Sequence, residues 1–442
     1  MVVGPSPARH GTSFWEIGDR AHGGIVRECR ATWGALAPFP RRVLRSIGNR
    51  SRTTGSEKLN APGEENTNSC GIIKYITVDD IISPSGSPFR VLCLDGGGMR
   101  GIYTAAYIAH LAQGFSAKRQ VGQLDIGAAF NLIVGTSTGA IIGCALAASV
   151  PPERILRLYR ENGAAIFRRK VPSGIGFPFL VDAVQRPHDL KSGEQSFREA
   201  LADCFGAATL AEVYSSRKIA LAITAVDMAR HRSWVFKTPH LPNTNHRDDR
   251  YTLVDVCLAS SAAPIFRSLA AIDSPEDPTS YTVFADGGMW ANSPVLVALI
   301  EALAMTDPGR PLEIFCLGTC PLPAGEQISK GAVHRGLLQW RFGADAASLS
   351  IDVQEFAFDR MARMLSKYVG RECSIIRFPR DEVPAAMMQY LDLDETRAEA
   401  ADSLIQLAKS DANMTNSRCG DIHDKQGRMM DRLFRDMPAF IS

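Results

Sequence analysis

The chain has 442 residues, of which 45% are hydrophobic and 22% are charged, so it can bury a sizeable core. Its formal net charge of +2 at pH 7 argues against a nucleic-acid partner, which would require a clear excess of positive charge. The longest apolar run, residues 140–150, is shorter than the roughly 18 residues of a membrane-spanning helix.

Residues 1–86 differ in composition from the rest of the chain. They are rich in glycine, proline, serine and arginine, and their apolar residues show weak periodicity. Because so little apolar material cannot form a packed core, we expect a disordered tail or a leader segment. An organelle transit peptide is the alternative, since residues 30–56 contain arginines and no acid.

From residue 87 onward, short apolar runs alternate with stretches of helical periodicity. Strands that are apolar nearly throughout are buried on both faces, so the alternation predicts a mostly parallel α/β sheet with helices on both faces. The expected strands are residues 89–94, 130–134, 219–226, 281–285 and 312–317. The expected helices pass through Tyr103, Tyr107 and Leu111, and cover residues 140–148, 151–168, 293–305 and 344–367.

A glycine-rich segment, residues 95–101, follows the first expected strand and reads DGGGMRG. The backbone N–H groups of Gly96, Gly97 and Gly98 can converge on one point and bind an oxyanion, with the positive charge of Arg100 nearby. The segment also fits the G-x-G-x-x-G fingerprint of a nucleotide-binding oxidoreductase. That alternative needs an acid at the end of the second strand, where none is found.

The strongest local motif is G-x-S-x-G at residues 135–139, between an apolar strand and an apolar helix. A sharp turn in this context exposes the serine hydroxyl at the carboxyl edge of the sheet. Gly135 and Gly139 leave room for the turn, and the positive end of the following helix favours an anion. Ser137 is therefore predicted to be a nucleophile, with a chance serine turn as the alternative.

Asp286 directly follows the strand expected at residues 281–285 and precedes two glycines. A carboxylate at a strand end can accept the proton of a serine hydroxyl. A histidine base is the alternative, and His188 and His231 are its best candidates. Neither is placed with an acid partner as in a Ser-His-Asp triad, so a dyad of Ser137 and Asp286 is favoured.

The three motifs, in this order along the chain, resemble those of the patatin-like phospholipases. The small-residue block at residues 259–264 and the segments 290–294 and 317–319 are also similar to that family. The likeness covers about residues 88–320 and has no departure at the three motifs.

The resemblance implies a three-layer sandwich with a central, mostly parallel sheet and a helical C-terminal extension. Residues 87–320 would form the catalytic domain, and residues 321–442 would be mostly helical and packed on it. The activity implied is that of a serine-dependent lipid acyl hydrolase of the phospholipase A type, without metal or cofactor. Its substrate would be a membrane phospholipid or another lipid ester.

The resemblance also implies a role for each residue of the motifs. Ser137 would attack the ester carbonyl and form an acyl-enzyme, while Asp286 would accept the proton of its hydroxyl. The oxyanion hole would be built from Gly96, Gly97 and Gly98, with Arg100 supporting the loop. A non-catalytic lipid sensor on the same fold is the other alternative, but it has no need of both Ser137 and Asp286.

A narrower similarity is to bacterial patatin-like effectors of cyclic-nucleotide anti-phage systems. It rests on residues 89–103 and on the long C-terminal extension. It implies a cyclic-nucleotide activator and a role in antiviral defence. The region after residue 320 and the loop at residues 170–190 would then carry the regulation.

Residues 171–189 combine prolines and glycines with apolar side chains, and arginines and a lysine precede them. We expect a loop that acts as a lid or contacts a membrane, or that packs onto the core instead. The ten cysteines have irregular spacings without a zinc pattern, which indicates a reduced protein. The expected location is cytoplasmic and peripheral at a membrane.

Overall fold

The computed structural model describes residues 86–440, except 169, 172–176, 278, 321–327, 338, 341–342 and 380–382. Residues 1–85 lie outside this part, so the predicted tail or leader stays a prediction. No helix in the described part of the chain is both long and apolar enough to cross a bilayer.

A mixed sheet forms the centre of the described part. Its strands are β1 (Phe89–Leu94), β2 (Leu132–Gly135), β3 (Ala220–Asp227), β4 (Arg232–Lys237), β5 (Ala270–Asp273), β6 (Tyr281–Asp286), β7 (Leu312–Leu317) and β8 (Cys373–Phe378). The order is β5-β6-β3-β2-β1-β7-β8, and β4 pairs with β3. The neighbouring strands β3, β2, β1, β7 and β8 are parallel. Strands β4 and β6 are antiparallel to β3, and β5 is antiparallel to β6. The predicted mostly parallel sheet is confirmed.

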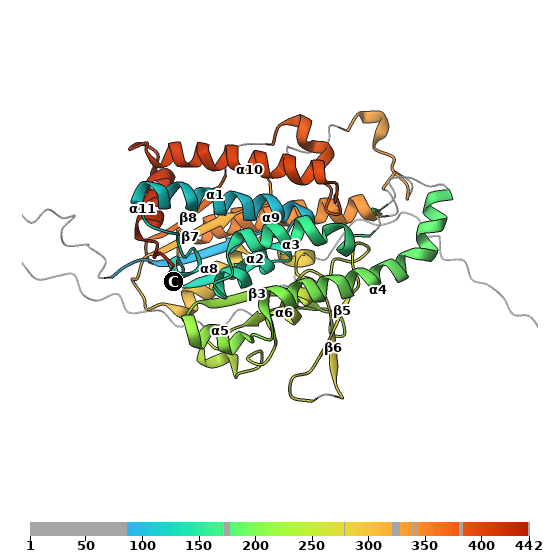
Figure 1. Cartoon of the computed structure of the whole chain (residues 1–442), viewed down its shortest axis with the longest axis horizontal. Coiled ribbons are helices and arrows are strands. Elements are labelled where there is room, and N and C mark those ends of the chain that lie inside the picture. The colour runs from blue at the N-terminus through green and yellow to red at the C-terminus, as the bar shows by residue number, and fades with distance from the viewer. Residues whose placement is uncertain are drawn as a thin grey trace, which may run out of the picture. The chain divides into compact units, whose positions relative to one another are not determined.

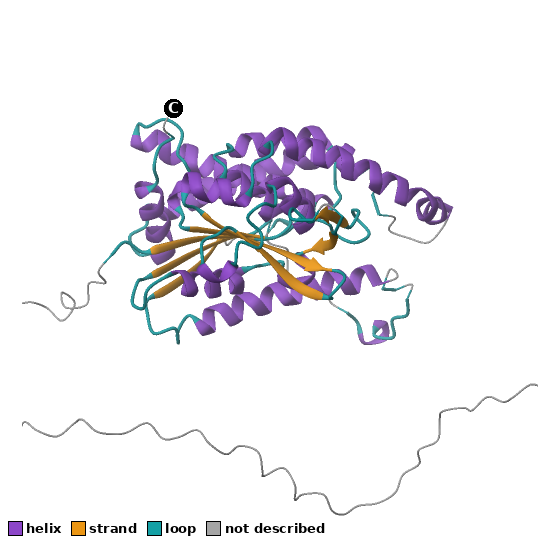
Figure 2. Cartoon of the chain, turned by 90° about the horizontal axis from the view of Figure 1, so that it is seen from below, coloured by secondary structure: helices purple, strands orange, loops and turns teal. Residues whose placement is uncertain are grey.

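Helices cover both faces of the sheet (Figure 2). They are α1 (Gly101–Arg119), α2 (Thr138–Ala147), α3 (Pro152–Ile166), α4 (Phe177–Phe205), α5 (Leu210–Arg217), α6 (Leu253–Ser260), α7 (Gly288–Ala291), α8 (Val295–Met305), α9 (Ala344–Leu365), α10 (Ala398–Cys419) and α11 (Lys425–Asp436). Alternate side chains of β1 point to opposite faces. Leu92 and Leu94 pack with α1 and α2, whereas Val91 and Cys93 pack with α8.

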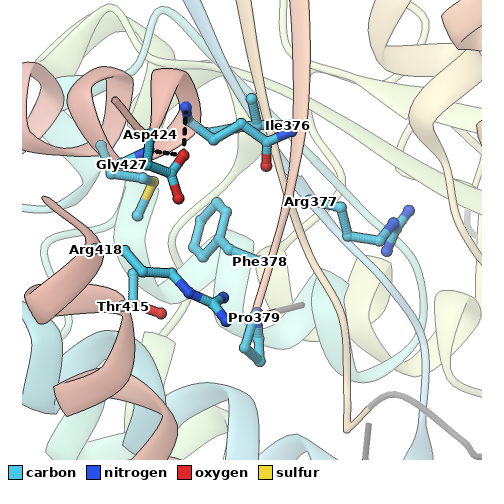
Figure 3. A pocket seen from close by; sticks show the side chains of 10 residues that line it. Ile376, Arg377, Phe378, Pro379, Thr415, Arg418, Asp424 and Gly427 are labelled. Carbon is cyan, nitrogen blue, oxygen red and sulfur yellow. Dashed lines mark hydrogen bonds between the residues drawn. The ribbon is translucent and has the colours of Figure 1, made fainter. Parts of the chain in front are cut away.

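The segment after residue 320 extends the sheet as well as covering it. In Figure 1, α10 lies alongside α1, and the hydroxyl of Tyr103 donates to Asp411 over 2.6 Å. β8 pairs with β7 and forms one edge of the sheet. Figure 3 shows Arg377 and Phe378 leaving β8 on opposite sides, with Phe378 facing a small pocket beside Thr415 and Arg418. The mostly helical extension therefore also contributes a strand that was not predicted.

The predicted loop at residues 171–189 differs from the structure. The helix α4 begins at Phe177 and continues through Pro187 to Phe205, and residues 172–176 lie outside the described part. A proline in the first turn of a helix costs little, because the N–H it lacks has no partner there. Packing of α4 against α3 and α6 stabilises the helix around the interior proline.

Candidate active site

The register of the sheet brings the three predicted motifs to one edge. β1 and β2 are parallel neighbours with Leu94 opposite Gly135, so the glycine-rich loop lies beside Ser137. β6 is antiparallel to β3, but it begins beyond the carboxyl end of β3 and runs back to place Asp286 opposite Ala225. Asp286 thus lies at the same edge of the sheet as the other two motifs, although its strand runs antiparallel to theirs.

Ser137 occupies a strained turn between β2 and α2. Its φ of 54° and ψ of −119° lie outside the regions that residues with a Cβ prefer. The surrounding backbone is tight, because a Cβ on Gly135 would lie 2.5 Å from the carbonyl oxygen of Gly139. A Cβ on Gly139 would lie 2.3 Å from the carbonyl oxygen of Leu94. The glycines of the motif are therefore required by close backbone contacts.

Ser137 and Asp286 are in direct contact. The Ser137 hydroxyl donates to Oδ2 of Asp286 over 2.8 Å, and the N–H of Gly288 donates to Oδ1 over 2.6 Å. Burial raises the pKa of Asp286 to about 6, against the opposing effects of the Gly288 N–H, the Ser137 hydroxyl and the charge of Arg267. A carboxylate with a pKa near neutrality suits a group that must accept a proton and return it.

The glycine-rich loop presents donors beside the serine. Gly97 and Gly98 line the same cavity as Ser137, and their N–H groups have no acceptor among the described residues. Gly96 differs from this expectation, because its N–H already donates to the carbonyl of Asn292 over 3.0 Å. Only two of the three predicted glycine donors are therefore free to meet an oxyanion.

Two side chains hold the glycine-rich loop in place. Arg100 is buried, and its Nε donates to the carbonyl oxygen of Gly97 over 3.3 Å. The hydroxyl of Thr138, the residue after Ser137, donates to the carbonyl oxygen of Gly98 over 2.6 Å. The loop and the serine turn are thereby fixed to each other.

A cavity of about 890 Å³ opens from the dyad. Its apolar lining includes Ile141, Ile166, Phe197 and Phe266. The α4 region, where an access loop was expected, contributes Asp182 and Phe197 to the wall. Lys170, which directly precedes the expected loop, contacts Asp392 over 2.7 Å and Glu395 over 3.0 Å.

The wall also contains residues from the C-terminal part that sequence reasoning did not place there. They are Ser348, Ile351 and Asp352 of α9 and residues 391–394. The carbonyl of Leu393 accepts a hydrogen bond of 2.9 Å from the N–H of Met99 in the glycine-rich loop. No sequence motif marks these residues, because every residue type has a backbone carbonyl that can accept such a hydrogen bond.

A short segment, residues 260–262, holds both members of the dyad. The Ser260 hydroxyl accepts the N–H of Ser137 over 2.8 Å, and the carbonyl of Ala262 accepts the N–H of Asp286 over 3.0 Å. This segment lies in the small-residue block noted in the sequence. The block was the available signal for it, although the pattern does not reveal which atoms it contacts.

The alternative sites predicted from the sequence do not form. Neither His188 nor His231 lines the cavity, and the side chain of His188 is 81% exposed. His231 is exposed in the turn between β3 and β4. β2 ends at Gly135 without an acid, so the geometry of a dinucleotide site is also missing.

The comparisons with known proteins agree with this arrangement. The family model of the patatin-like phospholipases matches residues 92–299. A cGAMP-activated phospholipase of Pseudomonas aeruginosa is 33% identical over 277 residues, which cover 62% of this chain and 74% of that protein. A cGAMP-activated phospholipase of Vibrio cholerae is 32% identical over 213 residues, covering 48% of this chain and 57% of that protein.

A eukaryotic relative shares the same region. Calcium-independent phospholipase A2-gamma of Rattus norvegicus is 29% identical over 244 residues, covering 53% of this chain and 29% of that protein. The level of identity with the Pseudomonas protein and the matched family model both confirm the expected family. This chain belongs to the patatin-like phospholipase family.

Proposed function

We propose that this chain hydrolyses fatty-acyl esters of phospholipids with Ser137 as nucleophile and Asp286 as base. The observation that carries the proposal is the 2.8 Å hydrogen bond from the Ser137 hydroxyl to Asp286. Two free N–H groups, those of Gly97 and Gly98, lie at the same cavity. Family membership supports the reaction class.

In the first half of the reaction, Ser137 Oγ attacks the ester carbonyl carbon and its proton passes to Asp286. The carbonyl oxygen becomes an oxyanion and accepts hydrogen bonds from Gly97 and Gly98. The bond to the alcohol then breaks, and Asp286 returns the proton to the leaving oxygen. The products are a lysolipid and an acyl-enzyme on Ser137.

In the second half, water takes the place of the alcohol. Asp286 accepts a proton from the water as its oxygen attacks the acyl carbon. The bond to Ser137 Oγ breaks, the serine recovers its proton, and the free fatty acid leaves. The cavity of about 890 Å³ falls within the usual size range of ligand pockets, and its apolar lining suits an acyl chain.

A cyclic nucleotide is the proposed activator, as the names of the Pseudomonas and Vibrio relatives state for those proteins. The cavity wall contains α4, α9 and residues 391–394, so movement of these segments on nucleotide binding would reshape the site. An enzyme that degrades membranes only after such a signal fits antiviral defence. The expected regulatory regions at 170–190 and after 320 include these wall segments.

A cytoplasmic location with peripheral contact to a membrane is part of the proposal. Exposed apolar side chains surround the cavity: Ile265 and Met289 line it and are 51% and 49% exposed. On α9, Leu349, Val353 and Phe356 lie next to lining residues and are 51%, 58% and 69% exposed. Burying this rim in a lipid surface would bring the substrate to the cavity.

The test measures fatty-acid release from mixed phospholipid vesicles in EDTA, with and without a panel of cyclic di- and trinucleotides. We expect release by the wild type, and a loss of at least about 1,000-fold in both Ser137→Ala and Asp286→Asn. Circular dichroism of each variant checks that the fold is retained. Release that survives either substitution would contradict the dyad, and release by the wild type without nucleotide would contradict the activator.

A further inference from the structure

A buried arginine faces the cavity beside the proposed dyad. Arg267 is 7% exposed and lines the same cavity as Ser137 and Asp286. Its guanidinium lies 3.9 Å from the centre of the Phe197 ring on α4. One of its terminal nitrogens donates to the Ser261 hydroxyl over 3.1 Å. These contacts fix the position of the guanidinium.

The charge of Arg267 has no direct ion-pair partner among the described residues. A buried cation without an ion-pair partner destabilises the folded protein, so the position of Arg267 calls for an explanation. Burial lowers the pKa of Arg267 to about 10, and the charge of Asp286 is the strongest influence that opposes this fall, ahead of Glu194 and Tyr159. The charge of Arg267 in turn lowers the pKa of Asp286, as the weakest of the effects that oppose burial, after the Gly288 N–H and the Ser137 hydroxyl.

Arg267 also supports the segment that carries the dyad. Its hydrogen-bond acceptor, Ser261, lies in residues 260–262, which bind the backbone N–H groups of both Ser137 and Asp286. The Ser261 hydroxyl itself donates to the carbonyl of Cys257 over 2.6 Å. The guanidinium therefore reaches the segment that holds the dyad through its hydrogen bond to Ser261, and its charge lowers the pKa of Asp286.

We propose that Arg267 is a positioning residue for Asp286, keeping this carboxylate ionised by its charge and holding residues 260–262 through Ser261. The proposal rests on the role of Asp286 as base in the proposed function. Without the guanidinium, Asp286 binds a proton at higher pH, and the protonated form cannot accept the proton of Ser137. Activity of a variant without this charge is then lost at mildly acid pH and recovers at alkaline pH.

Other titratable groups near the pair have their own partners or do not change between variants. Tyr159 of α3 has a pKa raised by burial and stays protonated. Glu194 of α4 contacts Arg198 at 4.0 Å, and Arg186 pairs with Asp182 over 2.6 Å. The remaining groups of this kind in the cavity lining are Arg100, Lys170, Asp352, Asp392 and Asp394. Because all of these are common to wild type and variant, a difference in pH profile isolates Arg267.

The experiment compares wild type with Arg267→Gln and Arg267→Lys on a neutral, water-soluble short-chain ester, across pH 5 to 9, with the panel of cyclic di- and trinucleotides present. In the wild type we expect kcat/KM to fall at acid pH with a midpoint near the pKa of Asp286, about 6. We expect the midpoint to rise by at least about 0.5 in Arg267→Gln, which is a roughly three-fold change in the proton affinity of Asp286. Arg267→Lys, which retains a charge, is expected to shift less.

A second readout and a control make the result specific. The rate at which a fluorophosphonate labels Ser137 should show the same shift in pH midpoint without any turnover. The control is Arg186→Gln, which removes an arginine that does not line the cavity and whose partner is Asp182 of the cavity wall rather than the dyad. We expect Arg186→Gln to leave the midpoint unchanged. Circular dichroism and the Arg267→Lys variant guard against a misfolded Arg267→Gln protein.

Two outcomes would overturn the proposal. Activity of Arg267→Gln that is reduced equally at every pH would mean that the charge of Arg267 does not keep Asp286 ionised, which contradicts the proposal. Activity lost on phospholipid but kept on the neutral ester, with an unchanged midpoint, would mean that it binds the lipid phosphate. Failure of the proposed function is distinguishable, because the wild type would then neither hydrolyse ester nor react with the fluorophosphonate at Ser137.

Discussion

The backbone of Ser137 has a φ of 54°, which residues with a side chain rarely adopt. Such strain persists only where surrounding contacts outweigh it. Here the Ser137 N–H is bound by Ser260, and Thr138 is bound to the glycine-rich loop. Gly139 permits the close approach of its own backbone to Leu94, so the position of the Ser137 hydroxyl depends on several neighbours at once.

This dependence predicts a large effect from a single methyl group. Gly139→Ala places a Cβ 2.3 Å from the carbonyl oxygen of Leu94, where neither strand nor helix can move freely. We expect a loss of about 2 kcal/mol or more in the free energy of unfolding, together with most of the activity. The matched control is Gly122→Ala, where a Cβ meets nothing within 4 Å, and a change within about 0.5 kcal/mol is expected.

Urea denaturation of both variants measures the difference. Equal stability of Gly139→Ala and Gly122→Ala would show that the turn can relax around the added methyl group, and that the motif glycine is not required by close contact.

Among the elements, β8 is joined to β1 through a charge pair although β7 lies between them in the sheet. Arg377 of β8 forms an ion pair with the buried Asp95, donates to the Ser293 hydroxyl over 2.8 Å, and reaches Asp359 of α9 over 3.2 Å. Burial raises the pKa of Asp95, and the charge of Arg377 opposes this rise. One side chain therefore connects the edge strand, the glycine-rich loop and α9.

Removing this connection should be costly. Arg377→Met leaves Asp95 buried without its cation, and we expect a loss of about 3 kcal/mol in the free energy of unfolding at pH 8. Without Arg377 the pKa of Asp95 rises further in the folded state, so stability falls as pH rises and the loss should be smaller at pH 5.5. Urea denaturation at the two pH values tests both statements.

An exposed arginine provides the comparison. Arg435 of α11 pairs with Asp431 over 2.8 Å, and its side chain is 72% exposed. Arg435→Met should cost less than about 1 kcal/mol. If Arg377→Met were equally mild at both pH values, the buried pair would not be holding the edge strand.

Prediction from the sequence succeeded where local pattern determines structure. The strands β1 and β7 were predicted at their observed ends, because buried central strands are apolar runs bounded by turn residues. The α4 helix was missed, since tertiary packing outweighs its prolines. Arg267 and Leu393 were not linked to Ser137, because no local pattern records that residues far apart in the chain will meet.

At the scale of the whole molecule, the charged and apolar surfaces are divided between two edges of the sheet. The cavity with its apolar rim lies at the carboxyl ends of the strands. At their amino ends, α11 is held by ion pairs from Asp436 to Arg90 and from Arg432 to Glu313. If the apolar rim contacts a membrane, as proposed, α11 would point away from the lipid.

This orientation predicts that a charge on the rim impairs hydrolysis of packed lipid. Phe356→Asp on α9 removes a side chain that is 69% exposed, so the fold should be unaffected. We expect release from vesicles to fall about ten-fold, since one large apolar side chain contributes roughly 1.5 kcal/mol or more when it leaves water. Hydrolysis of a water-soluble short-chain ester should stay unchanged.

The matched control for this variant is Ile422→Asp. Ile422 is 71% exposed and lies between α10 and α11, away from the rim. Vesicle flotation with both variants measures binding directly. If Ile422→Asp impaired vesicle hydrolysis as much as Phe356→Asp, the rim would not be the lipid-contacting surface.

The late position of Arg377 and Leu393 in the chain has a consequence for biosynthesis. Ribosomes complete Ser137 and Asp286 well before they reach β8 and the backbone that binds Met99. A nascent chain therefore carries both members of the proposed dyad while its glycine-rich loop still lacks two of its contacts. A chain that lacks β8 and Leu393 would therefore hold the glycine-rich loop without the ion pair to Asp95 and without the hydrogen bond to Met99.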